Sequence, residues 1–164
     1  MRFTTQAEYG LICAVHLARR AGEGPVAARE MAEVEDLPAD YTEKILRRLR
    51  QAGLVSSVRG VSGGFALARE PGEISVKDVV IATEGTTFEV NCETRPVDDE
   101  RCAEDHDCVI RPVWRALKER IDELLADIRL SDLVEQGEEE MEELIELAWS
   151  EEEEDAAPTA AEPA

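Results

Sequence analysis

The chain has 164 residues and a mass of 18.2 kDa, enough for one hydrophobic core and a small extension, which excludes a large multidomain enzyme. Its 38 acidic and 18 basic residues give a net charge of −20, and such a charge would repel nucleic-acid phosphates. The charge is unevenly distributed, because residues 1–69 hold 8 acidic and 10 basic residues whereas residues 70–164 hold 30 and 8. A nucleic-acid-binding role therefore stays open for the first part of the chain.

The sequence has no stretch of roughly 18 apolar residues that could span a membrane, and its start leads into an amphipathic segment rather than a secretory signal. We therefore expect a cytoplasmic protein with no membrane partner. Cys13 stands alone, whereas Cys92, Cys102 and Cys108 lie within 17 residues. An odd group of three cysteines in such a chain indicates metal or redox chemistry.

Three helices are predicted first, over residues 5–21, 27–34 and about 38–53, from apolar residues at helical spacing and glycines at the ends. Two short apolar segments, 54–59 and 65–68, then flank a glycine-rich turn and predict a β-hairpin. Three helices followed by a hairpin make a winged helix-turn-helix, so the predicted fold is mainly α with a small β wing.

The third predicted helix has a polar and mostly basic outer face. This face carries Thr42, Glu43, Lys44, Arg47, Arg48, Arg50 and Gln51. A basic helix alone fits a solvated surface equally well. The hairpin favours DNA binding, because it places Arg59 at a flexible tip beside the cationic helix.

The remaining chain divides into a further helix, a long loop and a long amphipathic helix. Ser75 and Asp78 resemble a capping box and predict a helix to about residue 83. The loop of residues 85–107 lacks periodicity and carries most of the clustered cysteines. From Val109, apolar residues spaced alternately four and three apart predict a coiled-coil seam, and hence a homodimer.

From Glu135 onward there are 13 acidic residues and no basic one. We expect one more acidic helix followed by disorder, with a solubilising role. A sharper hypothesis is that this tail competes with DNA phosphates for the basic face. The predicted domains are a DNA-binding winged helix (1–84), a cysteine loop that binds a cluster (85–108), a dimerisation helix (109–134) and an acidic, partly disordered tail (135–164).

The cysteine spacing is Cys92-x9-Cys102-x5-Cys108, with His106 two residues before the last cysteine. Three thiolates in one loop could hold an iron–sulfur cluster or a zinc ion, or could act as a thiol–disulfide switch. The spacing leaves all three open. Cys13, in the middle of the first helix, is predicted to be a core residue, and His16 is predicted to have a structural role.

Four features together resemble the IscR and NsrR regulators. They are the opening Met1-Arg2-Phe3-Thr4-Thr5 with Tyr9-Gly10, the hairpin of residues 53–68, the three clustered cysteines, and Trp114 shortly after Cys108. The resemblance covers residues 1 to about 134. It implies a dimeric winged-helix transcription factor that binds a palindromic operator in double-stranded DNA. Its cofactor would be an iron–sulfur cluster, 2Fe-2S or 4Fe-4S, that senses iron–sulfur status, nitric oxide or redox stress.

The resemblance also assigns roles to residues. Cys92, Cys102 and Cys108 would bind the cluster. Helix 38–53 would enter the major groove through Tyr41, Glu43 and Lys44, and Arg59 on the wing would enter the minor groove. The full predicted DNA-binding set is Tyr41, Glu43, Lys44, Arg47, Arg48, Arg50, Ser57, Arg59, Gly60, Gly63 and Gly64.

The fourth cluster ligand departs from one family pattern. IscR-like members have a histidine three residues after the last cysteine, where this chain has Arg111. An NsrR-like arrangement would instead use Glu8 of the other subunit, with His106, solvent or a small molecule as alternatives. Thr5 and Glu8 also have the spacing of a capping box, which would give Glu8 a purely structural role.

We expect the cluster-bound form to repress transcription. The alternatives are the same fold with a zinc site or a cluster-free thiol switch and, more remotely, an iron–sulfur carrier protein. No nucleophile elbow or P-loop is present, so an enzyme is not expected.

Overall fold

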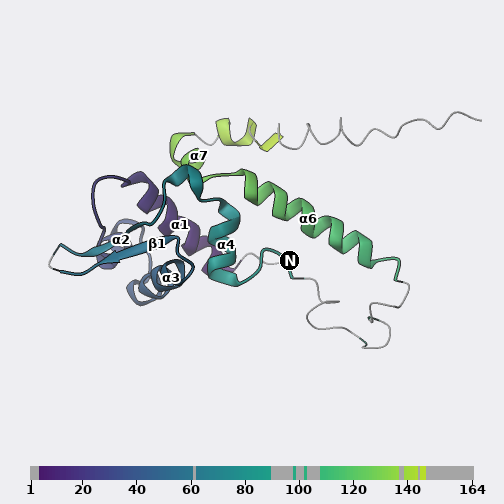
Figure 1. Ribbon diagram of the computed structural model, residues 1–164, viewed down its shortest axis with the longest axis horizontal. Helices are drawn as coiled ribbons and strands as arrows, with labels where there is room; N and C mark the ends of the chain where they lie inside the picture. The colour runs from purple at the N-terminus through teal and green to yellow at the C-terminus, as the bar shows by residue number, and fades with distance from the viewer. Residues whose placement is uncertain are drawn as a thin grey trace, which may run out of the picture.

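A computed structural model describes residues 4–60, 62–89, 98, 102, 108–136, 139–143, 145 and 146. The elements in chain order are α1 (Thr5–Arg19), α2 (Ala28–Val34), α3 (Ala39–Gln51), β1 (Val55–Val58), β2 (Gly64–Leu67), the short 3-10 helix η1 (Pro71–Glu73), α4 (Val76–Glu84), α6 (Arg111–Asp127) and α7 (Leu130–Glu135) (Figure 1). Three helices followed by an antiparallel hairpin confirm the predicted winged helix, mainly α with a small β wing.

The helix ends follow local capping chemistry. In α4, the Ser75 hydroxyl accepts a hydrogen bond from the Asp78 backbone at 3.1 Å and the Asp78 carboxylate accepts one from the Ser75 backbone at 3.0 Å, as predicted. The predicted box at the start of α1 is wrong. The cap is Thr4, whose hydroxyl accepts from Gln6 N at 3.1 Å, so Glu8 lies one residue too far along the helix to close a box with it.

The wing is attached to the helices at its base. β1 and β2 pair from Val55 opposite Leu67 to Val58 opposite Gly64. Phe65 also exchanges two backbone hydrogen bonds of 2.8 Å with Val26, which lies in the link between α1 and α2. This contact fixes the direction in which the hairpin leaves the body of the domain.

One main core lies between α1, α2, α3, α4 and the wing. Its fully buried members include Cys13, Met31, Ile45, Leu46, Leu49, Ile74, Val79 and Leu130. Leu130 belongs to α7, so the chain returns to the winged helix after the long helix. Such burial of apolar side chains is the main source of stability in a domain of this size.

The predicted continuous helix over 109–134 is interrupted. α6 ends at Asp127, and Ile128 is extended with φ −79° and ψ 121°. The reason is backbone pairing, because Val76 N donates to Ile128 O and Leu130 N donates to Ile74 O, each at 2.9 Å. A short bridge between segments far apart in sequence therefore replaces one helical turn.

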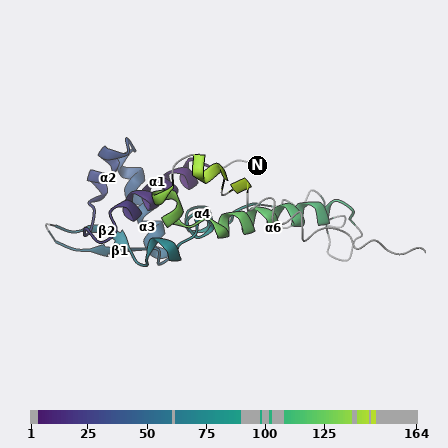
Figure 2. The same ribbon diagram turned by 90° about the horizontal axis from the view of Figure 1, so that it is seen from above.

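A second, smaller core lies where α4 and α6 meet. Val76, Val80 and Ile128 are buried there, and Met141 and Ile145 of the acidic segment pack against them. The N-terminal half of α6, in contrast, projects away from the winged helix, on the side opposite the wing strands (Figures 1 and 2). None of the helices in the described part of the chain has the length and apolar composition required to cross a bilayer.

Candidate DNA-binding surface and cysteine loop

Helix α3 presents one polar face and one core face. Ile45, Leu46 and Leu49 are fully buried, whereas Glu43, Lys44, Arg47, Arg50 and Gln51 are exposed. Thr42 is a correction to the predicted outer face: it is fully buried, and its hydroxyl donates to the Pro38 carbonyl at 3.1 Å. The remaining face is net basic and open to a ligand.

Two contacts organise the exposed face of α3. The Lys44 ammonium lies 5.8 Å from the centre of the Tyr41 ring, and that ring packs edge-on against Tyr9 at 5.5 Å. Arg47 forms an ion pair of 2.7 Å with Glu43 one turn earlier. Exposed pairs of this kind contribute little to stability, so Arg47 can leave Glu43 for a phosphate at small cost.

Arg48 differs from its basic neighbours. It is half-buried, and its guanidinium donates a hydrogen bond to the carbonyl of Thr83 at the end of α4. Its predicted place on the outer face is wrong, because the side chain points toward α4 rather than away from the domain. Its contact with DNA stays a prediction.

The wing adds further polar groups beside α3. Arg50 Nη1 donates to the Ser57 hydroxyl at 3.1 Å and so joins the end of α3 to β1. Arg59 and Gly60 are exposed at the far end of the hairpin. The structure therefore brings Arg50, Ser57 and Arg59 onto the surface that continues from α3.

The wing glycines are sterically required. A Cβ on Gly63 would lie 2.4 Å from the Val58 carbonyl oxygen, and one on Gly64 would lie 2.3 Å from that of Val26. Gly60 has φ +128°, a backbone conformation that residues other than glycine rarely adopt. These residues shape the wing, and their contact with DNA stays a prediction.

Arg111 connects the two cysteines that the structure describes. Its guanidinium donates to the Cys102 carbonyl at 3.1 Å, and its backbone N donates to the Cys108 carbonyl at 3.3 Å. Both cysteines are half-buried, and neither forms a disulfide with another cysteine in the described part of the chain. α6 begins at Arg111, so Cys108 precedes the helix rather than starting it.

Two half-buried thiols six residues apart in the chain are soft donors of the type that iron–sulfur clusters and zinc use, so the donor set fits such a group. Cys92 and His106 lie outside the described residues. Within the described residues, no three potential ligands from His, Cys, Asp and Glu come together. Ligation by these residues accordingly stays a prediction.

Glu8 is exposed in the first turn of α1. Its carboxylate has no hydrogen-bond or ion-pair partner in the part of the chain that the structure describes. The capping box is absent, so the local role left to this carboxylate is its favourable position near the positive end of the helix dipole. It remains available to a group outside its own subunit.

Cys13 is a core residue, as the sequence predicted, and His16 is buried as well. Burial, followed by the nearby charge of Glu35, raises the pKa of the Cys13 thiol to about 12. His16 is buried, and its Nδ1 lies 2.7 Å from the Glu35 carboxylate. Neither side chain is placed to bind a metal together with Cys102 and Cys108.

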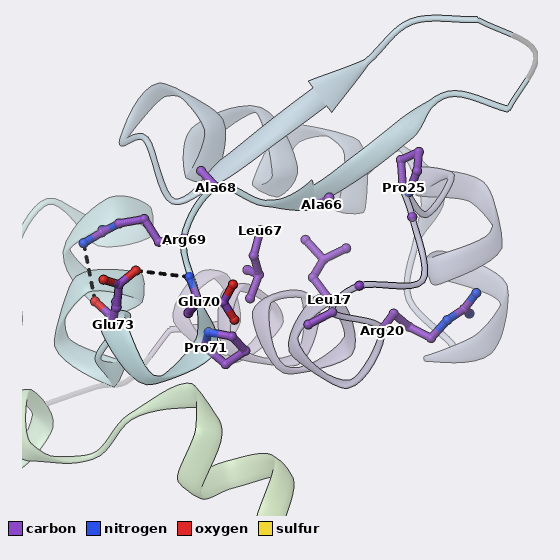
Figure 3. Close-up of a pocket in the computed structure, with 13 residues that line it drawn as sticks. Leu17, Arg20, Pro25, Ala66, Leu67, Ala68, Arg69, Glu70, Pro71 and Glu73 are labelled. Atoms are coloured by element: carbon purple, nitrogen blue, oxygen red, sulfur yellow. Dashed lines mark hydrogen bonds between the residues drawn. The ribbon is translucent and has the colours of Figure 1, made fainter.

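A cavity of about 730 Å³ lies behind the wing, between the end of α1, β2 and η1 (Figure 3). Its floor is formed by side chains such as Leu17, Leu67 and Pro71, and Arg69 and Glu73 are joined by a hydrogen bond at its edge. No predicted DNA-binding or metal-ligating residue lines it. This cavity is therefore separate from both candidate sites.

The sequence matches the Rrf2 family, described as an iron-dependent transcriptional regulator, over residues 3–136. The chain belongs to the Rrf2 family. It is 35% identical over 134 residues to the HTH-type transcriptional regulator IscR of Xenorhabdus nematophila, covering 82% of this chain and 79% of that protein. The resemblance to IscR is thereby confirmed.

Two solved structures resemble this Rrf2 protein. CymR, the global cysteine regulator of B. subtilis, is 31% identical, with a TM-score of 0.68 over 82% of this chain and 97% of CymR. IscR of T. potens is 35% identical, with a TM-score of 0.66 over 85% and 90%. The relatives are transcriptional regulators rather than enzymes, which confirms the predicted class. This Rrf2 protein is a DNA-binding transcriptional regulator with a winged helix.

One charged centre of this Rrf2 regulator was not predicted from the sequence. Asp122 of α6 accepts a hydrogen bond from the Thr87 hydroxyl and pairs with Lys118 at 3.0 Å and Lys77 at 3.6 Å. Burial alone would raise the pKa of Asp122, but these partners together lower it. The i, i+4 spacing of Lys118 and Asp122 is visible in the sequence, whereas the contacts with Thr87 and Lys77 depend on the fold.

Proposed function

We propose that this protein is a homodimeric repressor whose binding to a palindromic operator depends on an iron–sulfur cluster. α3 would enter the major groove, and Arg59 on the wing would enter the minor groove. Support comes from the exposure of Lys44, Arg47 and Arg50 on one surface continuous with the wing. Basic groups on such a surface supply phosphate contacts and the salt dependence of binding.

The cluster would be held by Cys92, Cys102 and Cys108, with Glu8 of the other subunit as the fourth ligand and His106 as the weaker alternative. The observation that carries this proposal is the double contact of Arg111, which keeps two thiol-bearing residues at the base of α6. When bound, the cluster would supply metal–sulfur bonds that nitric oxide, oxygen or iron loss can break. Both the 2Fe-2S and the 4Fe-4S type fit this donor set.

Homodimerisation would use the projecting part of α6. This part exposes the large apolar side chains of Val113, Trp114 and Leu117, and the two residues directly before the helix, Val109 and Ile110, are exposed as well. A contiguous apolar face of this kind on a projecting helix is typical of a protein–protein interface. Among them, Ile110, Trp114 and Leu117 lie four and three residues apart, the spacing of a helix-pair seam, which supports a second copy of this chain as the partner.

The residues of the chain suffice for a simple regulatory mechanism. Fixing the loop of residues 85–108 against α6, and against Glu8 of the other subunit, would set the distance between the two α3 helices. Half-sites on DNA lie about 34 Å apart or at multiples of that distance, so a changed separation costs base contacts. A useful switch needs about 1–3 kcal/mol of coupling between the loop and the DNA-binding surface.

The test is anaerobic purification followed by absorption spectroscopy, native mass spectrometry and operator mobility shift. We expect a coloured dimer with bound iron and sulfide that binds the operator more tightly than the cluster-free form. Cys102→Ser and Cys108→Ser should lose the colour and the tight binding, whereas the control Cys13→Ala should keep both. Tighter operator binding after cluster removal would overturn the proposed direction of regulation.

A second candidate is a cluster-free thiol switch on the same fold. The observation that favours it is the likeness to CymR, a regulator whose name refers to cysteine. Metal-free protein with a reversible disulfide among Cys92, Cys102 and Cys108 would support this candidate. Colourless protein with one zinc ion per chain would indicate a structural metal site instead.

A further inference from the structure

The carbonyl oxygen of Thr83 joins three helices. Thr83 lies in the last turn of α4 and is 1% exposed. Its carbonyl accepts hydrogen bonds from the Arg48 guanidinium of α3 and from the Gln6 amide of α1. A buried carbonyl held by two side-chain donors keeps them in place, since separation would leave polar groups unsatisfied.

The packing around Thr83 is also tight. A Cβ on Gly10 of α1 would lie 2.6 Å from the Thr83 methyl group, so α1 approaches α4 as closely as glycine permits. The Thr83 hydroxyl donates back to the carbonyls of Val79 and Val80. Since neither the side chain nor the carbonyl has room to move alone, a displacement of the end of α4 must be shared by α1 and α3.

The proposed function connects two segments with the cluster, namely the cysteine loop and the part of α1 that carries Glu8. Both begin within two residues of Thr83 or of its donor Gln6. Gly85 ends α4 with φ +87°, two residues after Thr83, and the chain then continues toward the cysteine loop. Glu8 follows Gln6 by two residues on α1. Figure 1 shows the start of α1 beside the end of α4, and Thr4 also donates a hydrogen bond to Glu84 there.

Arg48 connects the Thr83 carbonyl with the helix that carries the candidate DNA-binding face. Arg48 lies on the inner face of α3, one residue after Arg47, which is exposed on the outer face. α3 is a single helix of 13 residues, so a displacement of Arg48 also displaces the outer face of the helix. Arg48 is therefore placed to move the DNA-binding face without being part of it.

We infer that the Thr83 carbonyl, with its donors Arg48 and Gln6, couples the state of the cysteine loop to the position of α3. Arg48 is in this role a positioning residue and not a DNA contact. This inference rests on the proposed function, because it concerns how the same regulation reaches the DNA-binding surface.

The test compares Arg48→Ala and Gln6→Ala with wild type, each with and without cluster, by operator titration over a range of salt concentrations. Coupling between two sites typically changes affinity by about 5- to 150-fold. We expect both variants to reduce the wild-type ratio of cluster-free to cluster-bound operator Kd toward one, with unchanged iron and sulfide content. Gln6→Ala removes no charge, so it separates coupling from electrostatics.

The matched control is Arg47→Ala, which removes the neighbouring exposed arginine. Arg47→Ala should weaken operator binding equally in the cluster-bound and cluster-free forms, so the ratio of the two Kd values is preserved. The slope of operator affinity against salt concentration should fall by about the contribution of one phosphate contact. Arg48→Ala should leave the salt slope unchanged. If circular dichroism shows that Arg48→Ala does not fold, Gln6→Ala and Arg48→Lys replace it. Their ratios of cluster-free to cluster-bound operator Kd then test the coupling.

The outcomes are distinguishable. A wild-type protein that binds the operator equally with and without cluster removes the proposed function, and this inference with it. A wild-type protein that responds to the cluster, with variants that respond equally well, overturns the inference alone. A reduced salt slope in Arg48→Ala with a preserved ratio would make Arg48 a DNA contact after all.

Discussion

Arg111 donates a hydrogen bond of 3.1 Å to the carbonyl of Cys102, nine residues earlier in the chain. The resemblance to IscR implies a histidine at the position of Arg111, where it would belong to the metal site itself. Here the side chain acts on the backbone of a cysteine instead. Arg111 thus supports the loop without supplying a ligand atom.

Arg111→Ala should loosen Cys102 in the metal-free protein. Loss of a hydrogen bond from a charged donor to a half-exposed carbonyl costs about 1 kcal/mol, equivalent to about a fivefold increase in local opening. Alkylation of Cys102 by iodoacetamide, followed by mass spectrometry, should accelerate accordingly. Arg29→Ala, which removes an exposed arginine from α2, serves as the control, and an unchanged Cys102 rate in Arg111→Ala would show that the hydrogen bond does not order the loop.

Cys13 should behave unlike the loop cysteines in the same assay. With a pKa of about 12, only about one Cys13 thiol in 10,000 is ionised at pH 8, against about one in four for an ordinary cysteine. We expect native protein at pH 8 to be alkylated at Cys102 and Cys108 and to be alkylated at Cys13 only after denaturation. Rapid labelling of Cys13 in the folded protein would contradict its placement in the core.

Asp122 should make stability depend on pH. Its pKa is lowered in the folded protein, because contacts with Thr87, Lys118 and Lys77 outweigh the effect of burial. A lowered folded-state pKa stabilises above the unfolded value, near 4, and that stabilisation is lost as pH falls through the folded value. Asp122→Asn should therefore lose about 1 kcal/mol of unfolding free energy at pH 7 and little at pH 3.

Urea unfolding at the two pH values measures this difference. Asp127→Asn, an exposed carboxylate on the same helix, is the control and should change stability little at either pH. An equal loss in Asp122→Asn at pH 3 and pH 7 would mean that packing, and not the carboxylate charge, explains the effect.

Features that depend on residues close together in the sequence were predicted correctly. Ser75 and Asp78 start α4 as expected, and Gly53, with φ +75°, follows α3 where a stop was predicted. The apolar spacing of a helix continues past Ile128, yet the chain is extended there, because Ile74 and Val76 offer backbone hydrogen bonds from another part of the sequence. Local periodicity contains no information about such a partner.

The same distinction applies to the candidate site. Arg47 and Arg48 are adjacent and equally basic, and the sequence assigned both to the outer face. In the structure the Arg48 guanidinium donates to the Thr83 carbonyl, whereas Arg47 is exposed. The side-chain pattern of α3 therefore predicted a basic outer face, but not which arginine points toward α4 instead.

The acidic C-terminal segment should contribute to stability through its apolar residues. Met141 and Ile145 are half-buried against Val76, Val80 and Ile128. Truncation after Gln136 exposes this second core and should cost about 2 kcal/mol, from two partly buried side chains. Truncation after Ser150 retains both side chains and should leave the unfolding free energy unchanged.

The two truncations also test whether the acidic charges compete with DNA. If they do, removal of residues 151–164 should raise operator affinity most at low salt, because screening weakens the competition as salt increases. A double variant, Met141→Ala with Ile145→Ala in the full-length chain, keeps every acidic residue and separates packing from charge. It should reproduce the stability loss of the longer truncation without any gain in DNA affinity, and an affinity gain in this variant would show that docking of the segment, rather than its charge, restrains DNA binding.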